Sequence, residues 1–127
     1  MDSQLVSLLL VEDEPDLREA LGEYLEACGF LVATAATASE ATVVAAQQPP
    51  RVILCDLSLP DLRGDLLLEE LHRTHPESLL YVHSGDTSFV PSDGLQAMGL
   101  DEDHVFFKPA DLVTMVNQLL ADLKIKR

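Results

Sequence analysis

The sequence has few of the residues that staple small secreted domains or hold structural metals. It contains only two cysteines, Cys28 and Cys55, and neither a CxxC pair nor a cysteine/histidine spacing typical of zinc sites. We therefore expect both cysteines to be small buried apolar residues. His72 and His75 stand three apart, but no third ligand accompanies them, which favours a solvated helix face over a metal site.

Basic residues and long apolar runs are also scarce. Eight lysines and arginines stand against 22 aspartates and glutamates, which gives a formal charge of −14. Such a surface repels polyanions, so we expect no direct binding to nucleic acid or to anionic membranes. No apolar run approaches the roughly 20 residues that span a bilayer, and no signal-peptide pattern opens the chain. We therefore expect a cytoplasmic protein without membrane insertion.

The length and composition predict one folded domain. The chain has 127 residues, of which 47% are hydrophobic, and no polar low-complexity stretch interrupts it. This length supports one substantial core and is too short for two. We therefore expect a single domain over residues 1–127.

Short apolar runs alternate along the chain with segments of helical periodicity. The runs expected to form strands are residues 5–11, 30–33, 52–55, 79–83 and 105–107. Near-continuous apolar strands that alternate with helices are typical of a parallel sheet covered on both faces. The sequence therefore predicts an α/β domain with three layers, α/β/α.

The segments between these runs carry helix start and stop signals. The expected helices begin at Pro15, at Ser39, near Asp65 and after Asp111. Ser39 and Asp111 are residues of the type that caps a helix N-terminus. Residues 85–103 are the exception, because Pro91, Gly94 and Gly99 allow only a short or irregular helix there.

Polar residues of one chemical set follow four of the expected strands: Glu12, Asp13, Asp56, Ser84 and Lys108. Functional groups of a parallel sheet collect beyond the carboxyl ends of its strands, so these residues should converge. Three carboxylates, a hydroxyl and an ammonium are the parts of a cation-assisted phosphoryl-transfer centre.

Three converging carboxylates need compensation, because their pairwise repulsion is on the order of several kcal/mol. Either one carboxylate takes up a proton or a divalent cation binds, and hard oxygen ligands match Mg²⁺. The alternative is that Glu12 and Asp13 only cap the next helix and that Asp56 is a solvated strand end. The coincidence with Ser84 and Lys108 favours the site.

The motifs VEDEP, DLSLPDLRG, HSGD and FFKP occur in an order and spacing that resemble the receiver domain of two-component response regulators. The resemblance covers essentially the whole chain. It implies a flavodoxin-like, five-stranded parallel sheet of order 2-1-3-4-5 with about five helices. It also implies a phosphoacceptor signalling domain that changes conformation to control a downstream effector protein or domain.

The resemblance further implies a phosphodonor, a cofactor and roles for individual residues. The donor would be a histidine kinase or a histidine phosphotransfer protein, and the cofactor would be Mg²⁺. The domain would not be an ordinary turnover enzyme, although Mg²⁺-dependent self-phosphorylation and slow autodephosphorylation are expected. By this match Asp56 is the phosphoacceptor, Asp13 a direct Mg²⁺ ligand, Glu12 a ligand acting through water, and the Ser58 backbone carbonyl a further ligand.

The same match gives Ser84 the role of the switch hydroxyl and Lys108 that of the cation pairing with the phosphoryl group. Pro109 falls where the family commonly has a cis Lys–Pro bond. The sequence departs from the family at Val105, where most receivers have an aromatic residue, and in residues 85–103, which are about two residues longer than usual. Both departures lie on the usual output face.

The resemblance also implies a partner surface near the start of the first helix, where the family usually receives its phosphodonor. Leu17, Arg18 and Leu21 lie there, and Arg18 is expected to be exposed. The leucines are equally well explained as core residues.

Other functions fit the sequence less well. A haloacid-dehalogenase-type phosphatase needs a second aspartate two residues after the nucleophile, and position 58 is a serine. A nucleotide-binding switch needs a GxxxxGK loop, and the chain has none. The remaining alternative is a receiver-fold interaction module that docks without phosphorylation. The cognate kinase, the oligomeric state and the choice between a stand-alone receiver and part of a larger regulator stay open.

Overall fold

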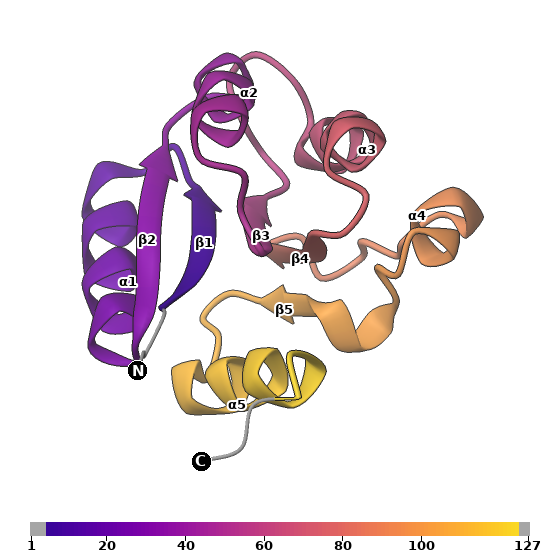
Figure 1. The fold of residues 1–127 in the computed structure, drawn as a ribbon. Helices are drawn as coiled ribbons and strands as arrows, with labels where there is room; N and C mark the ends of the chain where they lie inside the picture. The colour runs from indigo at the N-terminus through magenta and orange to yellow at the C-terminus, as the bar shows by residue number, and fades with distance from the viewer. Residues whose placement is uncertain (1–4, 125–127) are drawn as a thin grey trace.

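A five-stranded parallel sheet forms the centre of the molecule in the computed structural model, which describes residues 5–124 (Figure 1). The strand order is β2-β1-β3-β4-β5, as the resemblance implied. The remaining residues of the predicted domain, 1–4 and 125–127, lie outside the described residues. The strands are β1 (Val6–Val11), β2 (Phe30–Ala35), β3 (Val52–Asp56), β4 (Leu79–Ser84) and β5 (Val105–Phe107).

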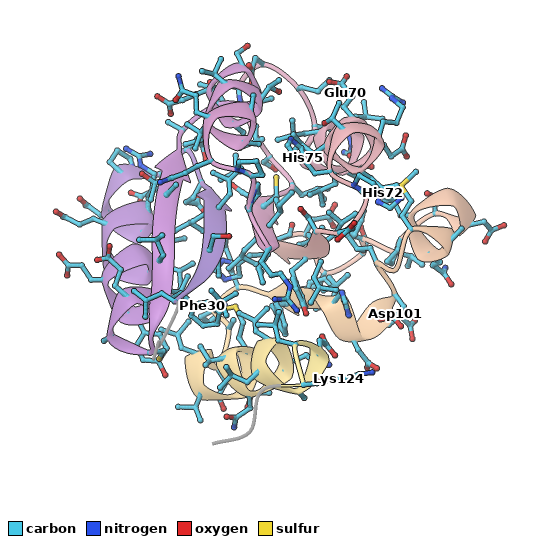
Figure 2. The ribbon with its side chains drawn as sticks, viewed as in Figure 1. Phe30, Glu70, His72, His75, Asp101 and Lys124 are labelled. Atoms are coloured by element: carbon cyan, nitrogen blue, oxygen red, sulfur yellow. The ribbon has the colours of Figure 1, made fainter. Side chains whose placement is uncertain are left out.

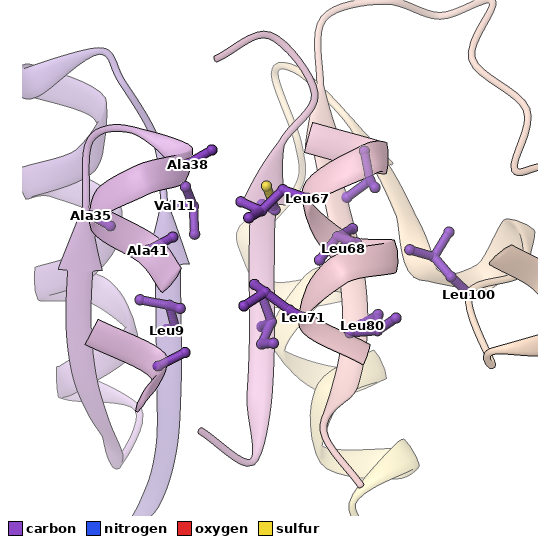
Figure 3. Close-up of a cluster of buried hydrophobic side chains, with 14 of the residues drawn as sticks. Leu9, Val11, Ala35, Ala38, Ala41, Leu67, Leu68, Leu71, Leu80 and Leu100 are labelled. Carbon is purple, nitrogen blue, oxygen red and sulfur yellow. The ribbon is translucent and has the colours of Figure 1, made fainter. Parts of the chain in front are cut away.

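Helices cover both faces of this sheet, which confirms the three-layer arrangement. Helices α1 and α5 bury apolar side chains against one face, and α2, α3 and α4 bury theirs against the other. Leu67, Leu68 and Leu71, for example, point from α3 toward the sheet (Figure 3). The helices are α1 (Pro15–Ala27), α2 (Ala38–Gln47), α3 (Gly64–Thr74), α4 (Asp93–Ala97) and α5 (Leu112–Asp122), with a 3₁₀ turn η1 (Glu102–His104) before β5.

Local sequence explains where α1 starts and stops. The Glu14 side chain accepts a hydrogen bond from the Leu17 N–H at 2.6 Å, and Pro15 occupies the first helical turn, where its missing N–H is not needed. The helix ends before Gly29, whose φ of +102° favours glycine. The β1–α1 loop follows the carboxyl end of β1, and this defined helix start keeps the loop short.

Two expectations about the elements are corrected. The N-cap of α2 is Thr37, whose hydroxyl accepts from the Glu40 N–H at 3.0 Å, whereas the Ser39 hydroxyl donates to Asp61. Strand β2 continues to Ala35, because its last residues pair with β1 in a continuous parallel register. The expected cap Asp111 is confirmed, and α4 has only five residues, as Pro91, Gly94 and Gly99 predicted.

The cysteines and histidines differ partly from expectation. Cys55 is fully buried, but Cys28 is only half-buried. His72 and His75 lie on and just after α3 (Figure 2). Both are half-buried rather than fully solvated, and neither joins a metal-ligand group among residues 5–124. In the same part of the chain, every helix is too short or too polar to cross a membrane.

Candidate phosphorylation site

The expected site residues gather at the carboxyl ends of β1, β3, β4 and β5. Glu12 and Ser84 are each 1% exposed and Asp56 is 5% exposed, although all three are polar. Asp13 is exposed, and the Lys108 side chain reaches in from the end of β5 with a quarter of its surface accessible. Three buried polar residues at one edge of the sheet mark a functional site, because removing charged side chains from water is costly even where they have partners.

The three carboxylates form one cluster. Glu12, Asp13 and Asp56 can each present a carboxylate oxygen so that all three oxygens lie within 4.8 Å of one another. Like charges at this distance repel, so a bound cation would stabilise the cluster. Oxygen ligands with one exposed edge, where water can complete the coordination, suit Mg²⁺. The residues present therefore fit the metal that the sequence predicted.

Lys108 partly compensates the carboxylates. Its Nζ donates to Glu12 Oε1 at 3.0 Å and lies 3.5 Å from Asp56 Oδ1. The Lys108 backbone N–H donates to the Ser84 carbonyl at 2.7 Å, which ties the end of β5 to the end of β4. The Lys108–Pro109 peptide bond is cis, as the resemblance implied.

The environment of Asp56 favours its protonated form. Burial, followed by the nearby Glu12 carboxylate, raises the pKa of Asp56 to about 6. Lys108 and the Ser58 backbone N–H, which donates to Asp56 Oδ1 at 3.3 Å, act in the opposite direction. Asp56 is therefore mostly ionised at pH 7, but its pKa lies only about one unit below that pH.

The loop after β3 closes tightly over Asp56. The Gly64 N–H donates to the Leu57 carbonyl at 2.8 Å. A Cβ atom at position 64 would lie 2.1 Å from the Asp56 carbonyl oxygen, so only glycine fits there. This close approach explains the glycine that follows Pro60 in the motif DLSLPDLRG.

Ser84 lies at the end of β4 but is turned toward the following loop. Its Oγ accepts a hydrogen bond from the Asp86 backbone N–H at 3.0 Å. The hydroxyl hydrogen can still donate to another group. The structure thus places Ser84 at the expected strand end while its oxygen organises the turn that starts residues 85–103.

Two further residues belong to the surroundings of the site and were missed or misplaced by sequence reasoning. Arg18 is half-buried rather than exposed, because its Nη1 donates to the Glu12 carbonyl at 2.8 Å. His83 is 3% exposed and pairs in register with Asp56, and its Nδ1 is buried without a hydrogen-bond partner. Burial and the Lys108 ammonium lower the pKa of His83 to about 4, so its ring is neutral.

His83 also lies beside an apolar hollow between α1 and the β5–α5 loop. The hollow has a volume of about 460 Å³ and is lined by Leu17, His83, Lys108, Pro109, Ala110 and Leu112. The strand-end residues alone did not indicate it, because it combines residues from opposite ends of the chain. Leu17 is half-buried and contributes to this wall, whereas Leu21 is a core residue.

The family model and the curated relatives that match this chain point to the same family. The model of the response regulator receiver domain matches residues 8–120. The probable transcriptional regulatory protein TcrX of Mycobacterium tuberculosis is 34% identical, with 97% of this chain and 52% of that protein covered. The transcriptional regulatory protein KdpE of the same species is 31% identical over 92% of this chain and 50% of its own length. The chain thus spans about half the length of these curated relatives.

Solved structures agree with the sequence matches. A CheY-like receiver domain protein from Methanospirillum hungatei superposes with a TM-score of 0.86 at 26% identity and covers 95% of both chains. The response regulator TrrA from Thermotoga maritima, solved in complex with Mg²⁺ and BeF, shares the fold with a TM-score of 0.76 at 19% identity over 94% of this chain and 97% of TrrA. The chain therefore belongs to the response regulator receiver domain family, whose members are phosphoacceptor signalling domains of two-component systems.

Proposed function

We propose that Asp56 is the residue of this receiver that takes up the phosphoryl group. The observation that supports it best is a buried carboxylate at the end of β3, beside two further carboxylates and 3.5 Å from the Lys108 ammonium. Among residues 5–124, no carboxylate outside Glu12, Asp13 and Asp56 joins such a cluster. The donor would be the phosphohistidine of a histidine kinase or of a histidine phosphotransfer protein.

The chemistry needs no protein base, because an ionised carboxylate is already a nucleophile. An Asp56 Oδ atom attacks the phosphorus, the bond between phosphorus and the donor imidazole nitrogen breaks, and the electron pair stays on that nitrogen. The product is an acyl phosphate on Asp56. Without metal, the raised pKa of Asp56, about 6, means that the nucleophilic carboxylate dominates only above that pH, and a bound cation would lower this pKa.

Mg²⁺ is the cofactor that we propose for this step. Asp13 and Asp56 would bind it directly, Glu12 through water, and the Ser58 backbone carbonyl would complete the protein ligands. When bound, the ion neutralises charge on the transferring phosphoryl group. The exposed position of Asp13 leaves one side of the cluster open to solvent and to a donor.

Lys108 and Ser84 would respond to the product. The new group adds roughly −1.5 to −2 charge next to Glu12, which the Lys108 ammonium can offset by turning from Glu12 to the phosphoryl oxygens. The Ser84 hydroxyl can donate to the same group if it moves inward, and this displaces the Asp86 N–H that it now binds. Movement of that turn would carry the signal into residues 85–103. Slow autodephosphorylation would then reset the domain.

The partners of the whole protein are also proposals. We expect the phosphodonor to dock over the apolar hollow beside Leu17 and Pro109, because it opens next to Lys108. A downstream effector protein or domain would read the phosphorylated state. We further propose that the domain extends over residues 1–127 and works in the cytoplasm, since the family match spans nearly this range and the expected donors are two-component kinases.

The direct test is phosphorylation by acetyl phosphate with Mg²⁺, followed by intact mass measurement. The wild-type protein should gain one phosphoryl group, and Asp56→Asn should gain none. Asp111→Asn serves as the control, because Asp111 is an exposed helix cap outside the site and should not affect labelling. Full labelling of Asp56→Asn would show that the acceptor is another residue.

A further inference from the structure

Asp61 joins two elements that are distant in the sequence. It lies in the loop between β3 and α3, and its carboxylate accepts hydrogen bonds from the first residues of α2. Oδ1 accepts from the Ala38 N–H at 2.9 Å, and Oδ2 accepts from the Ser39 N–H and the Ser39 hydroxyl, both at 3.0 Å. Both carboxylate oxygens are therefore used in one contact between a loop and a helix.

These bonds also fix the charge of Asp61. The Ala38 and Ser39 N–H groups lower the pKa of Asp61, so the carboxylate is ionised at neutral pH. A negative charge at this point also suits the positive end of the α2 dipole. The contact is charge-assisted, which makes each bond stronger than one between neutral groups.

The start of α2 does not depend on Asp61 alone. Thr37 accepts from the Glu40 N–H at 3.0 Å, and Glu40 Oε1 accepts from the Ala36 N–H at 2.5 Å. Together Thr37 and Glu40 supply a local cap from the residues of α2 itself. The contact with Asp61 therefore fixes the loop at least as much as it fixes the helix.

The loop that Asp61 holds is the one that shapes the phosphorylation site. Ser58 stands three residues before Asp61, and its N–H donates to Asp56 Oδ1 at 3.3 Å. Ser58 itself is exposed, as are Pro60 and Asp61. Half-buried Leu59 and Leu62 pack against the core, but apolar contacts are not directional. Asp61 supplies directional contacts from this exposed stretch to α2.

We propose that Asp61 is a positioning residue of the phosphorylation site, which acts by fixing Ser58 relative to Asp56 through the tie to α2. The proposal rests on the proposed function, because it assumes that the Ser58 carbonyl and Asp56 bind the same Mg²⁺. Loss of the tie lets the loop sample other positions, so the metal ligands are no longer held together before the ion arrives. Removing the support of a metal ligand typically lowers metal affinity by about 10-fold to 100-fold.

The test compares Asp61→Ala with a matched helix-cap variant. Asp111→Ala removes the same kind of contact, since Asp111 accepts from the Val113 and Thr114 N–H groups and from the Thr114 hydroxyl. Asp111 caps α5, and these hydrogen bonds stay within the first turn of that helix. Mg²⁺ affinity is measured by calorimetry, labelling by acetyl phosphate over a range of Mg²⁺ concentrations, and stability by urea unfolding.

Asp61→Ala should bind Mg²⁺ at least about 10-fold more weakly than wild type, whereas Asp111→Ala should bind it normally. Labelling of Asp61→Ala should be slow at low Mg²⁺ and recover at saturating Mg²⁺, which a general loss of stability would not produce. Asp61→Asn, which keeps one carbonyl acceptor, should fall between Asp61→Ala and wild type, and it serves as the reporter if Asp61→Ala folds poorly.

Two results would overturn the proposal: wild-type Mg²⁺ affinity in both Asp61 variants, or an equal loss of affinity in Asp111→Ala. Failure of the proposed function looks different, because the wild-type protein would then not be labelled at Asp56. In that case the Mg²⁺ affinities alone still decide whether Asp61 positions the cluster.

Discussion

Two neighbouring side chains, Asp56 and His83, have pKa values shifted toward their neutral forms. Burial and Glu12 raise the pKa of Asp56 to about 6, and burial and Lys108 lower that of His83 to about 4. The register of β3 and β4 puts these two residues opposite each other. Between about pH 4 and pH 6 both side chains are therefore predominantly neutral. Their contributions to stability change over nearly the same pH range but with opposite sign, so a variant of each residue is needed to separate them.

Asp56→Asn should stabilise the metal-free protein at neutral pH. The folded-state pKa of Asp56, about 6, lies above the ordinary value of 3.8. Its contribution to stability is therefore fully present below about pH 4 and is lost as the pH rises through 6. A shift of this size corresponds to an upper limit of about 3 kcal/mol. Urea unfolding without metal should show that the gain from the substitution is larger at pH 7 than at pH 4.

Asp111→Asn is the control for this measurement, because hydrogen bonds from Thr114 and Val113 lower the pKa of Asp111. The sign is then reversed and the pH range is lower: relative to wild type, Asp111→Asn should lose stability as the pH rises through the range below about 4, and the difference between the two proteins should change little between pH 4 and pH 7. A gain in Asp56→Asn that does not vary with pH would mean that ionisation of Asp56 is not the cause.

His83→Leu should make the protein less sensitive to acid. The pKa of His83 is lowered from 6.5 to about 4, so the unfolded chain takes up a proton first as the pH falls below 6.5. Stability present above that pH is thus lost progressively on the way to pH 4, by about 3–4 kcal/mol at most. The leucine variant should lose less over the same range. Its stability at pH 7 should be close to wild type, because the replaced Nδ1 has no partner.

The comparison is made by urea unfolding at about pH 7 and about pH 4 in parallel with wild type. Equal losses in the two proteins would show that His83 does not contribute to the acid response. His72→Leu is a useful second variant, since His72 also has a buried unpaired Nδ1 but lies on α3, whereas His83 lies at a strand end opposite Asp56.

At the scale of elements, the strand ends were predictable from the sequence and the helix caps only in part. Apolar runs that end in polar residues predicted Glu12, Asp56 and Lys108 at one edge, because parallel topology leaves few other arrangements. Thr37 and Ser39 are both good N-cap residues, and local sequence does not distinguish them. The choice follows from Asp61, more than twenty residues away, which uses the Ser39 hydroxyl as a donor.

The same reasoning explains why Arg18 was predicted to be exposed. An arginine on the polar side of an amphipathic helix is normally solvated. Here its guanidinium reaches the backbone carbonyl of Glu12, a contact that depends on how the β1–α1 loop folds back over α1. Periodicity describes which face of a helix is apolar, but it does not describe where a long polar side chain ends.

Residues 85–103 are the element most able to change on phosphorylation. Helix α4 has five residues, and the valine at position 105 is half-buried against the same core cluster as Phe89 and Met98 of this segment. A valine has no ring to swing between two positions, and its side chain has few rotamers. The readout should therefore use the segment that is joined directly to Ser84 and is weakly held.

Amide hydrogen exchange with and without beryllofluoride and Mg²⁺ should show the largest change between residues 85 and 103. With Asp56 as the acceptor, the reagent would add a phosphoryl-like group there, and inward movement of Ser84 would break its bond with the Asp86 N–H. Shifting a segment from a 1:99 to a 99:1 ratio of two conformations takes about 5.5 kcal/mol. This free energy is easier to supply for the weakly held residues 85–103 than for a strand paired in the sheet.

Asp56→Asn under the same conditions is the control for nonspecific effects of the reagent. A change confined to residues 105–108, with residues 85–103 unaltered, would show that the signal leaves the site through β5 instead. A change of equal size in α2, at residues 38–47, would point to the β3–α3 loop and its Asp61 contact.

At the scale of the whole molecule, acidic charge and site are connected. The net charge of −14 gives a negative field over the surface, and the exposed edge of the carboxylate cluster lies within it. Such a field attracts cations in general and repels further negative charge. A test for a specific Mg²⁺ site must therefore separate binding at the cluster from screening of the whole surface.

Mg²⁺ should raise the thermal midpoint of unfolding more than a monovalent salt of the same ionic strength does. Binding to the folded state alone stabilises it by about 2.7 kcal/mol when the free ion is at 100 times its dissociation constant. Screening should act equally on wild type and on Asp13→Asn, because one exposed carboxylate changes the net charge little. Specific binding should be lost in Asp13→Asn, since the variant keeps only Glu12 and Asp56 of the cluster. The thermal midpoint should therefore rise more with Mg²⁺ than with the monovalent salt in wild type but not in Asp13→Asn. An equal rise in both proteins would mean that Mg²⁺ acts on the charge of the whole molecule and not at this site.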